Sequence, residues 1–284
     1  MNKKRKKNLL EEDIKESLSD IISDFELIVK MLHEMSYKFE NVTAPIRKAI
    51  STHFLAHIGD SCVSILKLLP YNELSATNDK EFAIFFNLSL FRNVIEATNN
   101  LYYYSLEEIT EEESNFRLLL FYYHNELETL NMAELLSFET TIKEIDVKQI
   151  EEKKYEILKD PIYLSLDKNL KKLIIDGKRY SHLTQTEIAK RRGIDFKYFR
   201  GLYKLLSGYT HSLPFAMDSI AVSTVHNFSI NFYASILNIV IYFLNSCLAD
   251  ILLRMGKFWD LHLSKSDESE IVYEYASALT EEFK

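Results

Sequence analysis

The chain has 284 residues, of which 47% are hydrophobic and 27% are charged, and this composition excludes a disordered or collagen-like polymer. Its 6 glycines and 4 prolines are too few for the frequent turns of a β-sandwich or β-barrel, so we expect an all-α fold. The net charge of −8 disfavours binding of nucleic acid over the whole surface, because an acidic body repels phosphate and only local basic segments can bind it.

The N-terminal end combines a basic run with a long amphipathic segment. Residues 3–7 are all Lys or Arg, and an acidic stretch rather than an apolar one follows them, which is not the pattern of a signal peptide. We expect residues 1–8 to form a disordered basic tail. From Leu9 to Phe39 apolar residues recur every three or four positions, which predicts the first helix.

Helix signals continue along the chain. Thr43 and Pro45 are typical of a helix start and Pro70 of a helix end, which predicts a second helix between them. Residues 139–172 are more charged and are interrupted at residues 160–161, so we expect a charged excursion from the bundle over residues 139–182. Further helices are predicted over about residues 80–105, 111–137, 186–192 and 195–207.

One segment is apolar on every side. No Asp, Glu, Lys or Arg occurs between Ser219 and Ala249, a stretch long enough to span a membrane. Asn231, Asn238 and Asn245 recur every seven residues, however, and such a polar seam is typical of a buried helix in a protein core. We therefore expect a central helix that ends near residue 253, and no contact with a membrane.

These elements predict the domain organisation. Residues 9–265 are expected to form a single multi-helix bundle around the apolar helix, and residues 266–284 an acidic C-terminal segment. Cys62 and Cys247 are too few for a disulfide framework and lack metal-ligand spacing, so we expect reduced, buried thiols in a cytoplasmic protein. We expect no cofactor.

Polar residues on the predicted third helix form the most informative pattern. Arg92, Glu96, Asn99 and Tyr103 fall within about 60° of one another on a largely apolar helix. In one interpretation, Arg92 and Glu96 form an ion pair whose only role is to fix the helix in the core. Alternatively, Glu96 orients a guanidinium that binds a phosphate or another anion. The second interpretation makes Arg92 and Glu96 candidate catalytic residues, with Asn99 in a supporting role.

A second polar set lies near the end of the last short helix. Tyr203, Ser207 and His211 are spaced by four residues, so they share one face if the helix reaches His211. An imidazole beside a hydroxyl can transfer a proton near neutral pH, whereas many helix-end histidines are capping or core groups. We take His211 as a catalytic candidate, supported by Tyr203 and Ser207.

Two further histidine patterns need an interpretation. Arg117 and His124 lie two helical turns apart on one face, which makes them an alternative catalytic pair. His53, His57 and Asp60 also share a helix face, as metal ligands would. This set lacks both the general-base Glu of the zinc-protease motif and a fourth ligand, so no metal site is expected.

A basic island occurs late in the acidic chain. Residues 178–204 hold eight Lys or Arg and two Asp or Glu. Ala189 and Gly193 fit a helix-turn-helix, but the helix that would read DNA is rich in Phe and Tyr and offers few polar groups to bases. We expect a helical corner whose outer face binds RNA or another anionic ligand. The candidate contacts are Lys190, Arg191, Arg192, Lys197 and Arg200.

Four short motifs, taken together, indicate a resemblance to a known family. They are the run from Val63 to Leu69, Arg92-x3-Glu96, Ala189-x3-Gly193 and Tyr203-x2-Leu206-Ser207-x3-His211. Over about residues 45–215 the chain resembles a prokaryotic all-helical family known only as a domain of unknown function. The resemblance implies that the helix-turn-helix pattern is a packing corner. It also implies that Arg92, Glu96 and His211 converge, supported by Tyr203 and Ser207.

That family is similar in turn to the HEPN helical bundles, many of which are metal-independent endoribonucleases of toxin, antiviral and abortive-infection systems. The resemblance therefore implies RNA cleavage in a bacterial defence or toxin system, by a homodimer. The HEPN signature places an Arg shortly before a His on one helix, but residue 204, seven before His211, is a Lys, and only Arg117-x6-His124 has the spacing. The alternative is a non-catalytic bundle that binds a protein or nucleic-acid partner.

Overall fold

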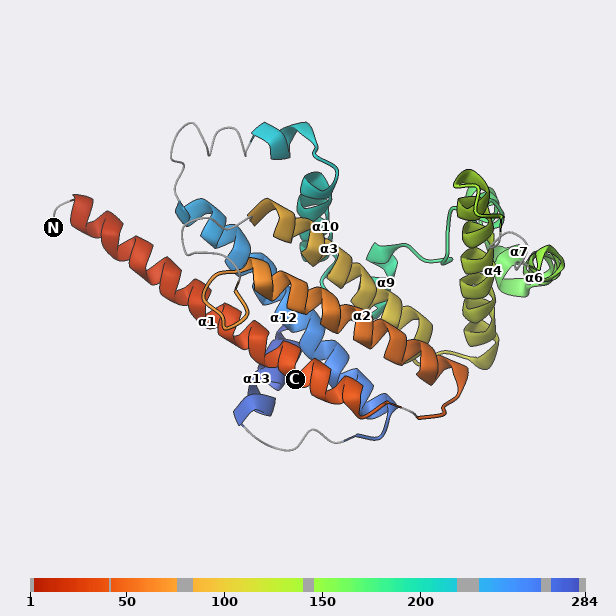
Figure 1. Cartoon of the computed structure of the whole chain (residues 1–284), viewed down its shortest axis with the longest axis horizontal. Helices are drawn as coiled ribbons and strands as arrows, with labels where there is room; N and C mark the ends of the chain where they lie inside the picture. The colour runs from red at the N-terminus through yellow and green to blue at the C-terminus, as the bar shows by residue number, and fades with distance from the viewer. Residues whose placement is uncertain are drawn as a thin grey trace. The chain divides into compact units, whose positions relative to one another are not determined.

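The computed structural model describes residues 3–40, 42–75, 84–139, 146–218, 230–261 and 267–280, and every regular element in these ranges is a helix (Figure 1). The all-α prediction is therefore confirmed. The elements are α1 (Lys3–Tyr37), α2 (Ile46–Leu68), α3 (Ile84–Leu101), the π-helical turn η1 (Tyr102–Leu106), α4 (Glu111–Leu135), α6 (Val147–Lys159), α7 (Pro161–Ser165), α8 (Lys168–Ile175), α9 (Gln185–Arg191), α10 (Phe196–Thr210), α12 (Ile230–Phe258) and α13 (Asp267–Leu279).

The chain divides into two compact units. The larger unit consists of Met1–Leu106 together with Gln185–Lys284, and the smaller unit of Glu107–Thr184. The sequence predicts one bundle over residues 9–265 with an excursion at residues 139–182, whereas the smaller unit begins before that excursion and includes α4. The reason is that α4 packs against α6, and the two helices share an apolar core of their own.

The centre of the larger unit is α12, which packs against α1, α3 and α13. Among the described residues Ser235–Phe258 is the one stretch long and apolar enough to cross a membrane, and 78% of its most apolar window is buried inside the protein. A core helix passes the same length and hydropathy test. Asn245 lies on the predicted polar seam, is buried, and donates a hydrogen bond to the Ile21 carbonyl at 3.2 Å. The side chain of Asn231, the start of that seam, lies outside the described residues.

The two ends of the chain are both helical where they are described. Residues 3–8, which the sequence places in a disordered basic tail over residues 1–8, lie within α1. Lys and Arg have high helix propensity, so a basic run can extend an amphipathic helix without apolar contacts. The acidic C-terminal segment forms α13, which packs on α12 and buries Val272 and Ala276.

The candidate residues are positioned by α3 and by the corner that α9 and α10 form. In the larger unit α3 packs against α2, α9, α10 and α12, and it continues into η1, whose five residues are all buried. The start of α10 is fixed by Asp195, whose carboxylate accepts a hydrogen bond from the Tyr198 N–H at 2.7 Å. The helix ends at Thr210, and His211 is its C-terminal cap. The histidine therefore lies at a helix end that packs along α3.

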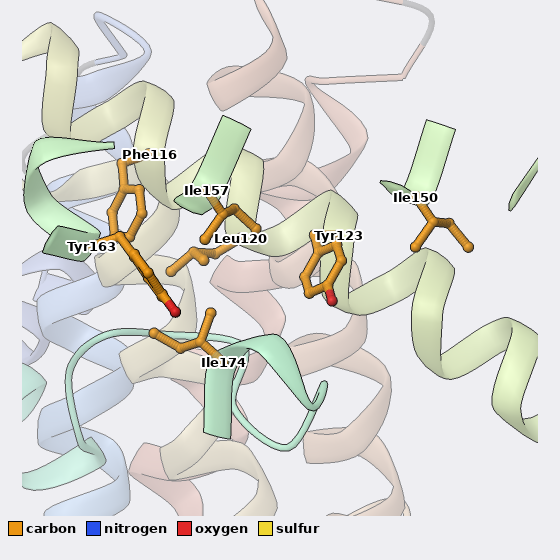
Figure 2. Close-up of a cluster of buried hydrophobic side chains, with 7 residues drawn as sticks. All are labelled: Phe116, Leu120, Tyr123, Ile150, Ile157, Tyr163 and Ile174. Atoms are coloured by element: carbon orange, nitrogen blue, oxygen red, sulfur yellow. The ribbon is translucent and has the colours of Figure 1, made fainter. Parts of the chain in front are cut away.

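The smaller unit has its own apolar core, formed by side chains from α4, α6, α7 and α8 (Figure 2). Its buried members are Phe116, Leu120, Tyr123, Ile150, Ile157, Tyr163 and Ile174. The Tyr123 hydroxyl donates a hydrogen bond to the Ile175 carbonyl at 2.7 Å, which satisfies the polar end of an otherwise apolar side chain.

Candidate functional site

Four of the predicted site residues form one network in the larger unit. Arg92 and Glu96 are one turn apart on α3, and their Nη2 and Oε1 atoms are 2.9 Å apart. The same Arg92 nitrogen donates a hydrogen bond to the Tyr203 hydroxyl at 3.1 Å, and Tyr203 donates its own proton to the Glu96 carboxylate. Arg92 Nη1 lies 3.2 Å from His211 Nε2. We call Arg92, Glu96, Tyr203 and His211 the α3–α10 cluster.

Aromatic packing holds the guanidinium of this cluster in place. Arg92 Cζ lies 5.1 Å from the centre of the Tyr203 ring, a cation–π contact. That ring stacks on Phe199, with ring centres 5.5 Å apart and planes 18° apart, and Phe199 is buried in the core. The guanidinium is thus oriented by a carboxylate, a hydroxyl and an aromatic face at once.

The contact between Arg92 and His211 determines which form of the imidazole is present. A guanidinium only donates hydrogen bonds, so Nε2 of His211 has to accept. The ring in this arrangement is therefore neutral, with its proton on Nδ1. His211 is exposed, whereas the side chains of Arg92 and Glu96 are only 16% and 26% exposed. A ligand can therefore approach the cluster from the histidine side.

The electrostatics of the cluster favour charged arginine and neutral tyrosine. Burial by itself lowers the pKa of Arg92, but the hydrogen bond with Tyr203 and the attraction of Glu96 more than offset this, and the pKa is raised. Burial raises the pKa of Tyr203, and its hydrogen bond to Glu96 raises it further. At neutral pH the cluster therefore combines a permanent cation with a phenol that donates a hydrogen bond.

The two supporting residues Ser207 and Asn99 lie in different places. Ser207 acts through its backbone, because its carbonyl accepts a hydrogen bond from the His211 N–H at 3.0 Å and so shapes the end of α10. Asn99 is buried one turn beyond Glu96, where its Oδ1 atom accepts a hydrogen bond from Arg192 Nη1 at 2.7 Å. Asn99 therefore belongs to a second network and not to the α3–α10 cluster.

The second network corrects one prediction, because Arg192 was expected among the exposed basic contacts and is 2% exposed. Its Nε and Nη2 atoms donate to the Asp250 carboxylate at 3.1 and 2.7 Å, and Nη1 donates to the Thr98 hydroxyl at 3.0 Å. The chain turns at Gly193, whose φ of 88° suits a residue without a side chain. The end of α9 thus points Arg192 inward against α12.

Asp250 is bound by a second arginine as well. Arg254, one turn later on α12, donates to the other Asp250 oxygen at 2.7 Å, and its guanidinium lies 5.0 Å from the ring centre of Tyr102. The partner of Asp250 is Arg192, from a distant part of the sequence. The sequence contains one indication of this ion pair. Asp250 is the first charged residue after a long apolar stretch, and a buried carboxylate needs a cation beside it.

The alternative catalytic pair lies in the smaller unit, and its two members have separate partners. Arg117 is 1% exposed and forms ion pairs with Glu107, at 2.6 Å, and with Glu113. His124 stacks on Tyr180 with ring centres 5.6 Å apart. Seven residues along a helix separate the two backbones by about 10 Å. The structure therefore uses Arg117 in a buried ion-pair network and does not bring it to His124.

The basic island is divided between the two units. Residues 178–184 belong to the smaller unit and residues 185–204 to the larger one. In the larger unit the remaining predicted contacts are all exposed, two on α9 and two on α10. They are Lys190, Arg191, Lys197 and Arg200. These cations are thus carried by the same helical corner as Tyr203 and His211.

The histidine pattern on α2 lies on the outside of the larger unit. His53, His57 and Asp60 are all exposed. Across the ranges that the structure describes, no three His, Cys, Asp or Glu side chains gather as metal ligands would.

Comparisons with protein-family models, with curated proteins and with solved structures give no match to this chain. The chemistry of the α3–α10 cluster and the motifs that form it are therefore the features that point to a function.

Proposed function

We propose that the protein is a metal-independent endoribonuclease whose site is the α3–α10 cluster. The observation that carries the proposal is the 3.2 Å approach of the Arg92 guanidinium to the exposed His211 imidazole, at the end of a helix that bears basic side chains. A single phosphate group is large enough to contact both side chains. The pairing supplies the two functions that RNA cleavage requires, a proton acceptor and a fixed cation.

The chemistry follows from the charges in the cluster. When a substrate phosphate replaces His211 as the acceptor of the Arg92 Nη1–H, His211 Nε2 is released and removes the proton of a ribose 2′-hydroxyl. The resulting oxygen attacks the adjacent phosphorus. The P–O5′ bond breaks, which leaves a 2′,3′-cyclic phosphate on one fragment and, after proton uptake from solvent, a 5′-hydroxyl on the other. Arg92 stabilises the charge that develops on the phosphate oxygens. Glu96 and Tyr203 are positioning residues, since they hold the guanidinium.

The resemblance to HEPN bundles supports this proposal and adds two expectations, a homodimer and a role in a defence or toxin system. The departure from the HEPN signature is accommodated by the geometry of this chain. Residue 204 is a Lys where the signature would place an Arg on the same helix, but Arg92 reaches His211 from α3. Histidine and arginine are therefore neighbours although they are 119 residues apart in sequence.

The test is incubation of the purified protein with end-labelled RNA in EDTA. We expect cleavage with 2′,3′-cyclic phosphate ends, and a rate that falls by about 10²–10⁴ in His211→Ala, the usual contribution of a positioned general base. His124→Ala is the matched control, because His124 belongs to the alternative pair and lies in the other unit. Loss of cleavage only in His124→Ala would move the site to the smaller unit. Absence of cleavage under all conditions would favour a non-catalytic binding bundle.

A further inference from the structure

One face of α10 is unusual because it combines exposed cations with a bare glycine. Lys197, Arg200, Gly201 and Lys204 fall on one side of the helix and are all exposed. Their spacing of three, one and three residues places them in a continuous stripe, and His211 lies two turns further along the same side. We call these four residues the α10 stripe. Asp195, the N-terminal cap, is the nearest exposed carboxylate on this helix.

Gly201 has no structural reason to be glycine. It lies in the middle of a helix, where glycine is less favourable than alanine, and it is not among the glycines with positive φ. A Cβ atom added at Gly201 would have nothing within 4 Å. Gly208, two turns later, is different, because a Cβ there would lie 2.1 Å from the ring of Phe215. Packing thus explains the glycine at position 208. At position 201, by contrast, the absence of a side chain leaves the helix backbone accessible to a ligand.

Two exposed aromatic residues flank the stripe at its N-terminal end. Phe196 is 45% exposed and Tyr198 is 44% exposed, one on each side of Lys197. Exposed aromatic rings between cations are the surface that single-stranded nucleic acids use, because unpaired bases stack on the rings while the cations contact the phosphates. A duplex keeps its bases stacked on one another and could use only the cations.

We propose that the α10 stripe binds a single-stranded RNA segment that runs along α10 toward His211. This inference rests on the proposed function and extends it to the class of substrate. The phosphates contact Lys197, Arg200 and Lys204, and the sugar–phosphate backbone approaches the helix most closely at Gly201. At least one base stacks on Phe196 or Tyr198. Positive charge on an otherwise acidic chain selects a polyanion as the occupant.

The test measures binding without cleavage. The probe is a fluorescein-labelled single strand of about 12 nucleotides whose 2′-hydroxyls are methylated, within the range that one such surface accommodates. Fluorescence anisotropy is recorded in EDTA at several salt concentrations. Replacing Lys197, Arg200 and Lys204 by Gln should make the log–log salt slope shallower by about 2, the value for three lost phosphate contacts on a single strand.

A glycine series separates binding from folding. Gly201→Ala and Gly201→Leu should both raise the melting temperature, because both residues favour a helix more than glycine does. We expect binding to weaken with side-chain size, by about ten-fold for Gly201→Leu, which is the loss of one close contact. The matched control for the basic residues is the triple change of Lys148, Lys159 and Lys168 to Gln, all exposed in the smaller unit. This control should bind as the unmodified protein does.

The outcomes distinguish the stripe from the proposed function. If the stripe and glycine variants bind the methylated strand normally while ordinary RNA is still cleaved, the stripe is not the RNA-binding surface. The proposed nuclease activity would then be unaffected. Loss of binding in these variants, with no cleavage by the unmodified protein, would support the stripe and remove the nuclease. Equal affinity for the same strand annealed to its complement would overturn the preference for single strands.

Discussion

Removing the Asp250 carboxylate tests how the core of the larger unit is organised. In Asp250→Ala the Arg192 guanidinium keeps neutral acceptors such as the Thr98 hydroxyl and the Asn99 side chain, but loses two hydrogen bonds and its counter-charge. Both partners are fully buried. Breaking a buried ion pair from one side costs about 3–5 kcal/mol, a large part of the roughly 5–15 kcal/mol that stabilises a folded domain.

The single tryptophan provides a reporter for this unit. Trp259 packs on Phe39 with ring centres 4.3 Å apart, so its fluorescence follows the unfolding of the larger unit. With a urea dependence of about 1–3 kcal/mol/M, the Asp250→Ala midpoint should fall by at least about 1 M. Asp20→Asn, an exposed change on α1, is the control and should move the midpoint little.

A double-mutant cycle sharpens the same prediction. Replacing the pair by apolar residues, as Arg192→Met together with Asp250→Leu, should cost clearly less than the sum of the two single changes, because neither ion is left alone in the core. Arg254 also loses Asp250 as a partner, and because its side chain is only 10% exposed, this part of the cost remains in the double variant. A midpoint shift below about 0.3 M for Asp250→Ala, or additive effects in the cycle, would show that no stabilising ion pair joins the end of α9 to α12.

Three further predictions concern other parts of the chain. Burial raises the pKa of the Cys247 thiol to about 12 and also raises that of Cys62, so neither thiol should react with a disulfide reagent such as DTNB until the protein is unfolded in urea; fast labelling of native protein would contradict this. Burial lowers the pKa of His124 in the folded protein. On acidification the unfolded chain therefore binds a proton at His124 before the folded chain does, and the smaller unit should lose stability as the pH falls below about 6.5. Urea titrations at pH 7 and pH 5 should show a smaller loss of stability in His124→Gln, and an equal loss in the two proteins would contradict the prediction. Gly177 has a φ of 71°, and a Cβ there would lie 2.9 Å from Leu127. Gly177→Ala should therefore destabilise the smaller unit by about 1–2 kcal/mol. Faster hydrogen exchange of the α8 amides would show this loss, and unchanged exchange would contradict it.

The fold class was predictable from the sequence because helix periodicity and composition are local properties. Two helices illustrate this: α12 follows from a run of apolar residues, and α4 was predicted over about residues 111–137 and begins at Glu111. The division into two units was not predictable. The division depends on which apolar helix faces pack together, and the sequence of α4 has the same apolar pattern as the other helices of the bundle.

The candidate site was predictable only in part. The Arg92–Glu96 pair follows from helical spacing, and the link to Tyr203 and His211 came from the set of motifs rather than from local physics. The burial of Arg192 does not follow from the sequence, because its neighbours Lys190 and Arg191 are exposed and the sequence does not indicate which of three adjacent cations turns inward. Only the turn at Gly193 and the distant carboxylate on α12 decide that orientation.

We propose that His211 and Arg92 together cleave RNA, and a strand with a single ribose tests this proposal. The substrate is a labelled DNA strand that contains a single ribonucleotide, incubated in EDTA with the unmodified protein, His211→Ala or Arg92→Lys. We expect one cut, on the 3′ side of the ribose, by the unmodified protein alone. His211→Ala lacks the base, and the lysine of Arg92→Lys keeps the charge but lacks the planar guanidinium that Glu96 and Tyr203 orient. A cut at an unchanged rate in His211→Ala, or cuts at deoxyribose positions, would contradict it.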